Sequence, residues 1–307
     1  MNLAIVDDIC CCCNNFGGSQ LNNWNLIQEG IKRKHKIRIV TPQNINLRSF
    51  EGIDLVLFTN IVNFPRETIQ DICNKYPYIF FHRDFNFCNG RLFFCADKKC
   101  EDCINKPFWS KIYSNAKFHI WLSPLHREGF LKVFPELDKF PKHCIPSSID
   151  IDLFKPFEGV ERKKGTVLGI NCLELFKGRY NIHNYVVEHP ELHFTFIGQA
   201  PQINAPNCTY LQYIKNEELP RLMSQFEYFI HLPNVIEPCG RCALEAILCG
   251  CKIITNSNNG AFSYNFMKKG INQIKSNLKV TPLSFWEQLE IFTGELKFEE
   301  EKKGEQN

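Results

Sequence analysis

The sequence lacks any apolar run that approaches the roughly 18 residues of a membrane-spanning helix. It also lacks the pattern of a secretory signal, because Asp7 and Asp8 interrupt the apolar start and no basic segment precedes it. The excess of positive charge is small, at +3, and no basic stripe with interleaved aromatic residues accompanies it. We therefore expect a cytoplasmic protein with no nucleic-acid partner.

Cysteine is too sparse for a disulfide-stapled scaffold. The chain has 16 cysteines among 307 residues, which is about 5%. Disulfide-stapled scaffolds typically have more than roughly 8–10% cysteine. Hydrophobic residues make up 44% of the chain, which is enough to bury the cores of the two domains that this length suggests. Most of the thiols are therefore expected to be free, in a reducing compartment.

The densest basic run is IKRKHKIR, at residues 31–38. One interpretation is a solvated helix end that leads into a strand. The other is peripheral contact with an anionic membrane surface, which attracts clustered Lys and Arg side chains. The expected location is therefore the cytoplasm, with membrane association as an open alternative.

Short apolar segments alternate with helical segments along two successive parts of the chain. The expected strands are 2–8, 36–41, 53–59, 76–82, 117–123 and 142–147 in the first part, and 165–170, 192–198, 227–233 and 251–256 in the second. This alternation predicts parallel sheets with helical crossovers. We therefore predict an α/β protein with two Rossmann-like, doubly wound domains that face a cleft.

The point where the alternation restarts predicts the domain boundaries. The first domain is expected at residues 1–148, and the second at residues 149–280, after a connecting segment that contains proline. Residues 281–307 are expected to form a C-terminal extension. It should contain a helix at 282–296 and a charged, frayed tail at 297–307.

The stretch EPCGRCALEAILCGC (237–251) places two glutamates and four cysteines around one predicted helix at 240–248. Cys239 and Cys249 then lie about 15 Å apart at the rise of an α-helix. Thiolates that share one zinc ion must each lie about 2.3 Å from it, so these four cysteines cannot form one metal site. We expect them to act as small apolar packing residues.

The start of this helix suits an anionic ligand. The first backbone N–H groups of a helix have no internal partners and lie in a partly positive field, and Gly240 allows a phosphate to approach them closely. Glu245, in the second turn, and Glu237, before the helix, can each accept hydrogen bonds from vicinal hydroxyls. Two carboxylates that flank a phosphate site fit a sugar nucleotide. The alternative is that both are ordinary surface glutamates.

These residues also resemble a known family. Residues 233–260 are similar to the E-x7-E region of the retaining GT-B glycosyltransferases of family 4, with matches at Glu237, Pro238, Gly240, Glu245, Ala246, Gly250 and Gly260. Further segments resemble the family in the same order along the chain, namely FGGSQ (16–20), FFHRDFNFC (80–88), SSIDIDLFKP (147–156) and FKG (176–178).

The resemblance implies a hexosyltransferase that moves a sugar from a UDP- or GDP-linked donor to an acceptor, which is a glycan, a lipid or a protein-linked sugar. It implies catalytic roles for Glu237, which would contact the transferred sugar, and for His82, which would lie near it. In such enzymes the leaving phosphate is thought to accept the acceptor proton, so no dedicated base is expected. No cofactor is expected for catalysis, which would rest on positioning and charge stabilisation.

The resemblance also implies a donor-binding set. Its members are Gly17, Gly18, Lys177, Gly240, Arg241 and Glu245. The lysine would pair with the diphosphate as a point charge, and the backbone N–H groups at the helix start would bind the same group. The glutamate would hold the ribose hydroxyls, and the two glycines after the first strand would allow that loop to approach the ligand.

The chain departs from the family pattern at two places. Ile170 and Asn171 stand where the family has an arginine for the diphosphate, and an arginine intervenes in the segment HRD (82–84). We expect Arg179 or Arg241 to fill the gap and favour Arg241, because it lies at the helix start. The departures leave two alternatives open: an inactive sugar-nucleotide-binding protein, or a GT-B-type sugar-nucleotide epimerase.

A second group of cysteines has a different spacing. Cys88, Cys95, Cys100 and Cys103 follow a C-x6-C-x4-C-x2-C pattern in a predicted loop, which can bring its ends together. A structural zinc or iron–sulfur site is one interpretation, and free thiols or a redox-dependent disulfide are the other. The four consecutive cysteines at 10–13 are expected to pack within a loop.

Overall fold

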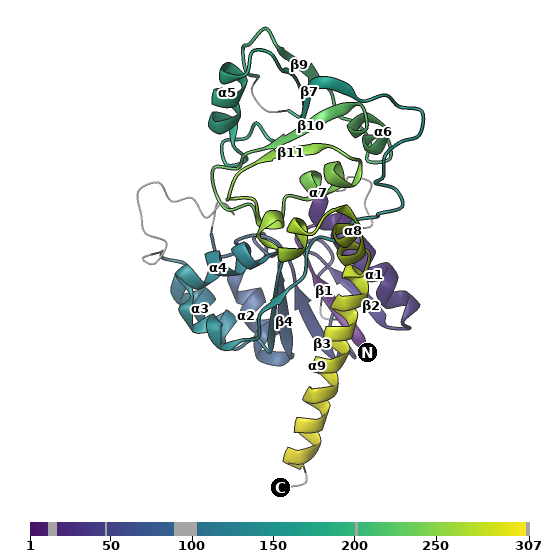
Figure 1. The fold of residues 1–307 in the computed structure, drawn as a ribbon. Helices are drawn as coiled ribbons and strands as arrows, with labels where there is room; N and C mark the ends of the chain where they lie inside the picture. The colour runs from purple at the N-terminus through teal and green to yellow at the C-terminus, as the bar shows by residue number, and fades with distance from the viewer. Residues whose placement is uncertain (12–16, 47, 89–102, 200–201, 305–307) are drawn as a thin grey trace.

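The computed structural model describes residues 1–11, 17–46, 48–88, 103–199 and 202–304, with the backbone alone at 295–304. It contains two α/β domains stacked end to end, with the N-terminal domain below the C-terminal one in Figure 1. Each domain is built on one sheet, and the strand pairs of the described residues are all parallel. The predicted architecture of two doubly wound domains is therefore confirmed.

The first domain carries a six-stranded sheet in the order β2-β1-β3-β4-β5-β6. Its elements are β1 (Asn2–Val6), α1 (Gly18–Lys32), β2 (Lys36–Val40), β3 (Leu55–Phe58), α2 (Arg66–Lys75), β4 (Tyr78–His82), α3 (Lys106–Ser114), β5 (Phe118–Trp121), α4 (Pro124–Val133), η2 (Pro135–Lys139) and β6 (His143–Cys144). The chain runs from β1 outward to β2 and then returns to β3 on the other side of β1. This reversal creates a crevice at the carboxyl ends of β1 and β3.

The second domain carries a five-stranded sheet in the order β11-β10-β7-β8-β9. Its elements are β7 (Lys163–Ile170), α5 (Arg179–Glu188), β8 (His193–Ile197), β9 (Cys208–Leu211), α6 (Leu219–Met223), β10 (Phe226–His231), α7 (Arg241–Leu248), β11 (Lys252–Thr255), η3 (Gly260–Ser263), η4 (Asn265–Lys268) and α8 (Ile271–Lys279). Here the strand order reverses between β7 and β10. In both sheets the reversal lies between two interior strands, and the carboxyl ends of β7 and β10 reach the junction of the domains at Ile170 and His231.

The central strands are apolar on both faces because other elements cover both faces of each sheet. Every side chain of β3 and β4 is buried. In the register of the first sheet, Ile5 lies opposite Ile39 of β2 and Leu57 of β3. One hydrophobic cluster continues from Ile5 and Leu57 through Phe154 of the connecting segment to Leu168 of β7, so the domains share a core.

The last helix, α9 (Thr281–Gly304), returns to the first domain and ends beyond it (Figure 1). The Trp286 Nε1–H donates to the Leu26 carbonyl of α1 at 2.7 Å, and its ring stacks on His35 at 4.6 Å between centroids. Arg33 pairs with Glu290 at 2.7 Å. These contacts confirm the expected helix.

The position of α9 bears on two predictions, one for the charged tail at 297–307 and one for the basic run at 31–38. The charged, frayed tail expected at 297–307 stays a prediction. The backbone of 297–304 continues α9, since Glu- and Lys-rich sequence is a good helix former, and 305–307 lie outside the described residues. The basic run 31–38 spans the end of α1 and the start of β2 and pairs partly with α9, which fits the interpretation as a helix end leading into a strand.

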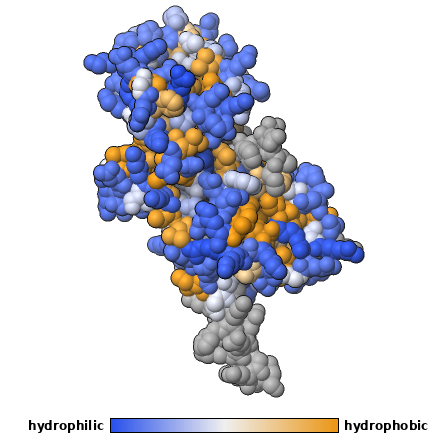
Figure 2. Space-filling view, turned by 90° about the vertical axis from the view of Figure 1, so that its right-hand side faces the viewer, coloured by the Kyte–Doolittle hydropathy of each residue, from blue (hydrophilic) through white to orange (hydrophobic). Residues whose placement is uncertain are grey.

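On the face shown in Figure 2, the second domain is mostly hydrophilic, and hydrophobic surface is more extensive around the junction and on the first domain. Within the part of the chain that the structure describes, no helix combines the length and the hydrophobicity of a membrane span. The location of the protein therefore stays a prediction.

Candidate active site

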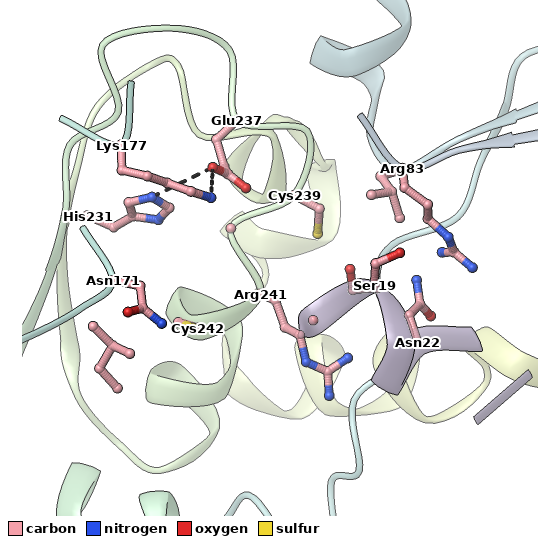
Figure 3. Close-up of a pocket in the computed structure, with 15 residues that line it drawn as sticks. Ser19, Asn22, Arg83, Asn171, Lys177, His231, Glu237, Cys239, Arg241 and Cys242 are labelled. Carbon is pink, nitrogen blue, oxygen red and sulfur yellow. Dashed lines mark hydrogen bonds and ion pairs between the residues drawn. The ribbon is translucent and has the colours of Figure 1, made fainter. Parts of the chain in front are cut away.

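A cavity of about 360 Å³ lies between the two domains, at the carboxyl ends of their strands. Its polar lining comes from Gly18, Ser19, Asn22 and Arg83 of the first domain, from Ser147 of the connecting segment, and from Asn171, Lys177, His231, Glu237, Gly240 and Arg241 of the second. Figure 3 shows Lys177, His231 and Glu237 together on one side, and Ser19, Asn22 and Arg83 on the other. A ligand in this cavity contacts both domains.

The segment before α7 is held by close backbone packing that requires glycine. The Glu237 N–H donates to the Asn258 carbonyl, and the Gly260 N–H donates to the Glu237 carbonyl, both at 2.8 Å. A Cβ added at Gly260 would meet the Pro238 carbonyl oxygen at 2.3 Å, and one at Gly240 would meet the Asn259 Oδ1 at 2.6 Å. These contacts fix Glu237 at the cavity and hold the first turn of α7 beside it.

Lys177 is positioned by a left-handed turn at Gly178. Gly178 has φ +113°, and a Cβ there would meet the Leu232 carbonyl oxygen at 2.0 Å. Only glycine can therefore bring the loop after β7 against the end of β10. The Lys177 Nζ then lies 2.6 Å from the Glu237 Oε2.

The Lys177–Glu237 pair is an electrostatic unit. Burial acts to raise the pKa of Glu237, but the charges of Lys177 and His231 outweigh it and hold the pKa below its ordinary value. Burial acts to lower the pKa of Lys177, and the neighbouring carboxylate raises it instead. His231 has its Nε2 4.0 Å from the same carboxylate, and burial together with Lys177 lowers its pKa to about 4. At neutral pH the cavity therefore presents an ammonium, a carboxylate and a neutral imidazole.

Arg241 lies at the start of α7 and covers Glu245. Its Nε donates to the Glu245 Oε1 at 2.6 Å, and its Nη1 donates to the Ser148 carbonyl at 2.6 Å. Glu245 is buried, and it does not line the cavity. The structure thus places Arg241 at the site as expected. The ribose-binding role of Glu245 stays a prediction, because Arg241 lies between this carboxylate and the cavity.

His82 does not lie where the resemblance suggested. It is fully buried in an aromatic cluster, where it stacks on Phe80 and Trp121 and has its Nε2 2.9 Å from the His119 Nδ1. It lines neither this cavity nor the neighbouring one. The expectation that His82 lies near the reacting sugar is therefore not met, and Arg83, the next residue, lines the cavity instead.

Of the two glycines after β1 that we expected to let this loop approach the ligand, one lines the cavity. Gly18 lines the cavity, and a Cβ there would lie 3.2 Å from the Arg241 Cδ, so the small residue lets the two domains approach. Gly17 is the N-cap of α1 and does not line the cavity. Ser19, in the first turn of the 15-residue helix α1, contacts the cavity as well.

A second cavity of about 430 Å³ adjoins the first. Ser19, Arg83, Lys177 and Glu237 line both cavities, so these residues form the partition between them. The second cavity has a different further lining, which comprises Asn60, Asp84, Phe176, Val235, Ile236 and Pro238. Two adjoining spaces around one ion pair suit two reactants that meet there.

Sequence reasoning missed Ser19, His231 and Arg83 as lining residues. The only available signal was the arginine inside HRD (82–84), which appeared as a departure from a pattern. Asn171, at the position of the expected arginine, lines the cavity with a left-handed backbone at φ +46°. Arg179, the other expected substitute, does not line it.

The cysteine predictions divide between described and undescribed residues. Of the four cysteines expected to be packing residues, Cys239, Cys249 and Cys251 are buried, whereas Cys242 is only partly buried and lines the cavity. Among the residues that the structure describes, no group of three or more metal-ligating side chains comes together. Cys95 and Cys100 lie outside those residues, so the zinc site with Cys88 and Cys103 stays a prediction.

No protein-family model matches the chain, and no curated protein matches it. The fold, however, is similar to solved GT-B glycosyltransferases over nearly its whole length. Sucrose-phosphate synthase from Thermosynechococcus elongatus has a TM-score of 0.68 at 12% identity, covering 97% of this chain and 98% of that one. Anabaena HepE in complex with UDP and glucose has a TM-score of 0.62 at 13% identity, covering 98% and 100%.

A third similar structure is an α-glucosyltransferase in complex with UDP and a 13-mer DNA. Its TM-score is 0.61 at 12% identity, covering 95% of this chain and 99% of that one. At this level of identity the likeness shows the GT-B fold.

Proposed function

We propose that the protein is a glycosyltransferase that transfers a hexose from a UDP- or GDP-linked donor to a sugar or lipid acceptor, with retention of configuration. The observation that carries the proposal is the Lys177–Glu237 pair, held at 2.6 Å beside the start of α7 in a cavity between two domains. An ammonium and the N–H groups in the first turn of a helix bind a diphosphate, and a carboxylate beside them binds sugar hydroxyls. At the N-cap of α7, the Gly240 N–H already donates to the Asn259 Oδ1 at 3.3 Å, so the N–H groups after it would bind the ligand. The fold neighbours that hold UDP support the donor class.

In the proposed reaction the bond between the anomeric carbon and the β-phosphate oxygen breaks, and the acceptor oxygen forms a bond to the same carbon. Negative charge develops on the leaving diphosphate, where Lys177 and the N–H groups at the start of α7 stabilise it. The leaving phosphate takes the acceptor proton. Glu237 orients the sugar through its hydroxyls, and the neutral His231 can donate or accept a hydrogen bond at the same place.

The second cavity is the proposed acceptor space. It shares Lys177 and Glu237 with the donor cavity, so an acceptor there reaches the transferred sugar directly. Phe176 and Ile236 give it an apolar part, and Asn60 and Asp84 give it polar groups. This mixture suits a sugar ring, which has both apolar faces and hydroxyl edges.

The experiment is a panel of UDP- and GDP-sugars, each incubated with the protein with and without simple sugar and lipid acceptors. Transfer, or slow donor hydrolysis to free sugar and nucleoside diphosphate, supports the proposal, and anomeric NMR of the product establishes the stereochemistry. Lys177→Met is the negative control, because it removes the ammonium that is proposed to stabilise the leaving diphosphate. An epimerised donor supports the epimerase alternative, and binding without turnover supports an inactive sugar-nucleotide-binding protein, which Ile170 and Asn171 at the arginine position favour.

A further inference from the structure

Arg83 is a buried cation whose hydrogen bonds are incomplete. Only 5% of the residue is exposed, and its guanidinium lies over the Phe81 ring at 3.7 Å. Nη2 donates to the Asn23 Oδ1 at 2.7 Å, but the buried Nε and Nη1 have no hydrogen-bond partner among the residues that the structure describes. Burying charged donors without acceptors is unfavourable, so a folded protein seldom keeps such a group without a use for it.

The other cations of the cavity already have carboxylate partners. Lys177 pairs with Glu237, and Arg241 pairs with Glu245. Arg83 forms no such pair with the described residues, and its hydrogen-bond link to Asp7 runs through Asn23. Among the described residues, Arg83 is therefore the cation of the cavity that no carboxylate pairs with directly.

Arg83 also has the right place for a ligand that touches both domains. It follows β4 in the first domain and lines both cavities, beside Ser19 and Asn22 in Figure 3. Burial lowers the pKa of Arg83, the charge of Asp7 opposes this, and Arg241 of the second domain is close enough for its charge to lower the pKa further. An anion placed between the two guanidinium groups replaces their repulsion with attraction to both.

We propose that Arg83 binds the diphosphate of the donor, so that this group is clamped between Arg83 of the first domain and Lys177 and Arg241 of the second. The inference rests on the proposed function, which supplies the diphosphate. Arg83 then provides the charge that is missing at Ile170 and Asn171, from the opposite domain. Donor binding thereby joins the two domains, and Nε and Nη1 gain the acceptors that they lack.

The test compares nucleoside diphosphates with nucleosides by isothermal titration calorimetry. UDP, GDP, uridine and guanosine are titrated into the wild type, Arg83→Gln and Arg83→Lys. Arg127→Gln is the matched control, because Arg127 is also buried in the first domain and lies over an aromatic ring, that of Trp121, but lines neither cavity. Thermal unfolding without ligand is measured for every variant.

Arg83→Gln should raise the Kd for the bound diphosphate at least tenfold and leave the Kd of the matching nucleoside unchanged. Arg83→Lys should give an intermediate Kd, and the Arg127 control should bind as the wild type does. Without ligand, Arg83→Gln should unfold at the same temperature as the wild type or higher, because it removes a buried charge with unsatisfied donors.

Three results overturn the proposal. If the wild type binds a diphosphate and Arg83→Gln binds it equally well, Arg83 has no role in binding, although the proposed function stands. If Arg83→Gln lowers the unfolding temperature and weakens diphosphate and nucleoside binding alike, the role of Arg83 is structural. If the wild type binds neither UDP nor GDP, the proposed function itself fails, and the role of Arg83 fails with it.

Discussion

Replacing Arg241 with alanine should weaken both donor binding and folding, for separable reasons. The side chain holds Glu245, which is 2% exposed, at 2.6 Å, and it also donates to the Ser148 carbonyl. Removing one partner of a buried ion pair costs about 3–5 kcal/mol, because the other charge is left without compensation. Removing a cation from a desolvated phosphate site should also raise the donor Kd at least tenfold.

The pH dependence separates the two effects. Burial raises the pKa of Glu245 above 4.5 even with Arg241 present. A carboxylate whose pKa is raised in the folded state lowers the stability of the fold as the pH rises above its pKa in the unfolded state. Protonation of the carboxylate at lower pH restores that stability. The stability difference between wild type and Arg241→Ala should therefore be largest near neutral pH and shrink as pH falls toward about 4.5.

The assay is denaturant unfolding at a series of pH values, together with calorimetric titration of UDP and GDP. Arg241→Ala with Glu245→Gln is the second variant, because it removes both charges and should recover much of the stability while donor binding stays weak. Arg179→Ala is the control, since Arg179 does not line the cavity. The reasoning is refuted if Arg241→Ala is as stable as the wild type at neutral pH, or if it binds the diphosphates equally well.

Three further predictions concern other parts of the molecule. Glu245→Gln should weaken nucleoside-diphosphate binding in calorimetry by about 1–3 kcal/mol if its carboxylate holds the ribose; an unchanged affinity removes that role. Transfer activity should survive EDTA, because Lys177 and the start of α7 take the place of a divalent ion; a loss that magnesium or manganese restores counts against this mechanism. Trp286→Ala should lower the free energy of unfolding by about 3–5 kcal/mol in denaturant titrations, because it removes a fully buried indole that donates to Leu26. A change below about 1 kcal/mol would show that α9 does not stabilise the first domain.

The second-domain half of the site could be predicted because its chemistry is local in sequence. A strand end, a glycine and a helix start lie within a few residues of one another, so Glu237, Gly240 and Arg241 were expected near a ligand. Lys177 was expected there because FKG (176–178) resembles the family pattern. All four residues line the cavity. The pairing of Arg241 with Glu245 could also have been anticipated. Residues four apart on a helix are neighbours, and opposite charges at this spacing attract.

The first-domain half could not be predicted in the same way. Which residue at the end of β4 reaches the cavity depends on how the chain turns after the strand, where the alternation of faces stops. The family resemblance implied that His82 would lie near the ligand, whereas its side chain is buried and Arg83 lines the cavity. That Arg83 lies near Arg241 follows only from the way the two domains pack.

The elements that were missed are the ones with weak patterns. β9 (Cys208–Leu211) is an edge strand with no fully buried residue, so its sequence carries little of the apolar signal that identified the central strands. α8 (Ile271–Lys279) buries only Ile274 and Leu278. β9 lies at the edge of the second sheet, where fewer contacts constrain the sequence.

The most direct test of the central claim is a crystal structure of the protein with bound UDP or GDP. The account predicts that the diphosphate lies at the start of α7, with Lys177 and Arg241 on one side and Arg83 on the other, and with Glu237 beside the distal phosphate. A nucleotide bound outside the junction cavity, or a diphosphate that contacts neither Lys177 nor the first turn of α7, would contradict it.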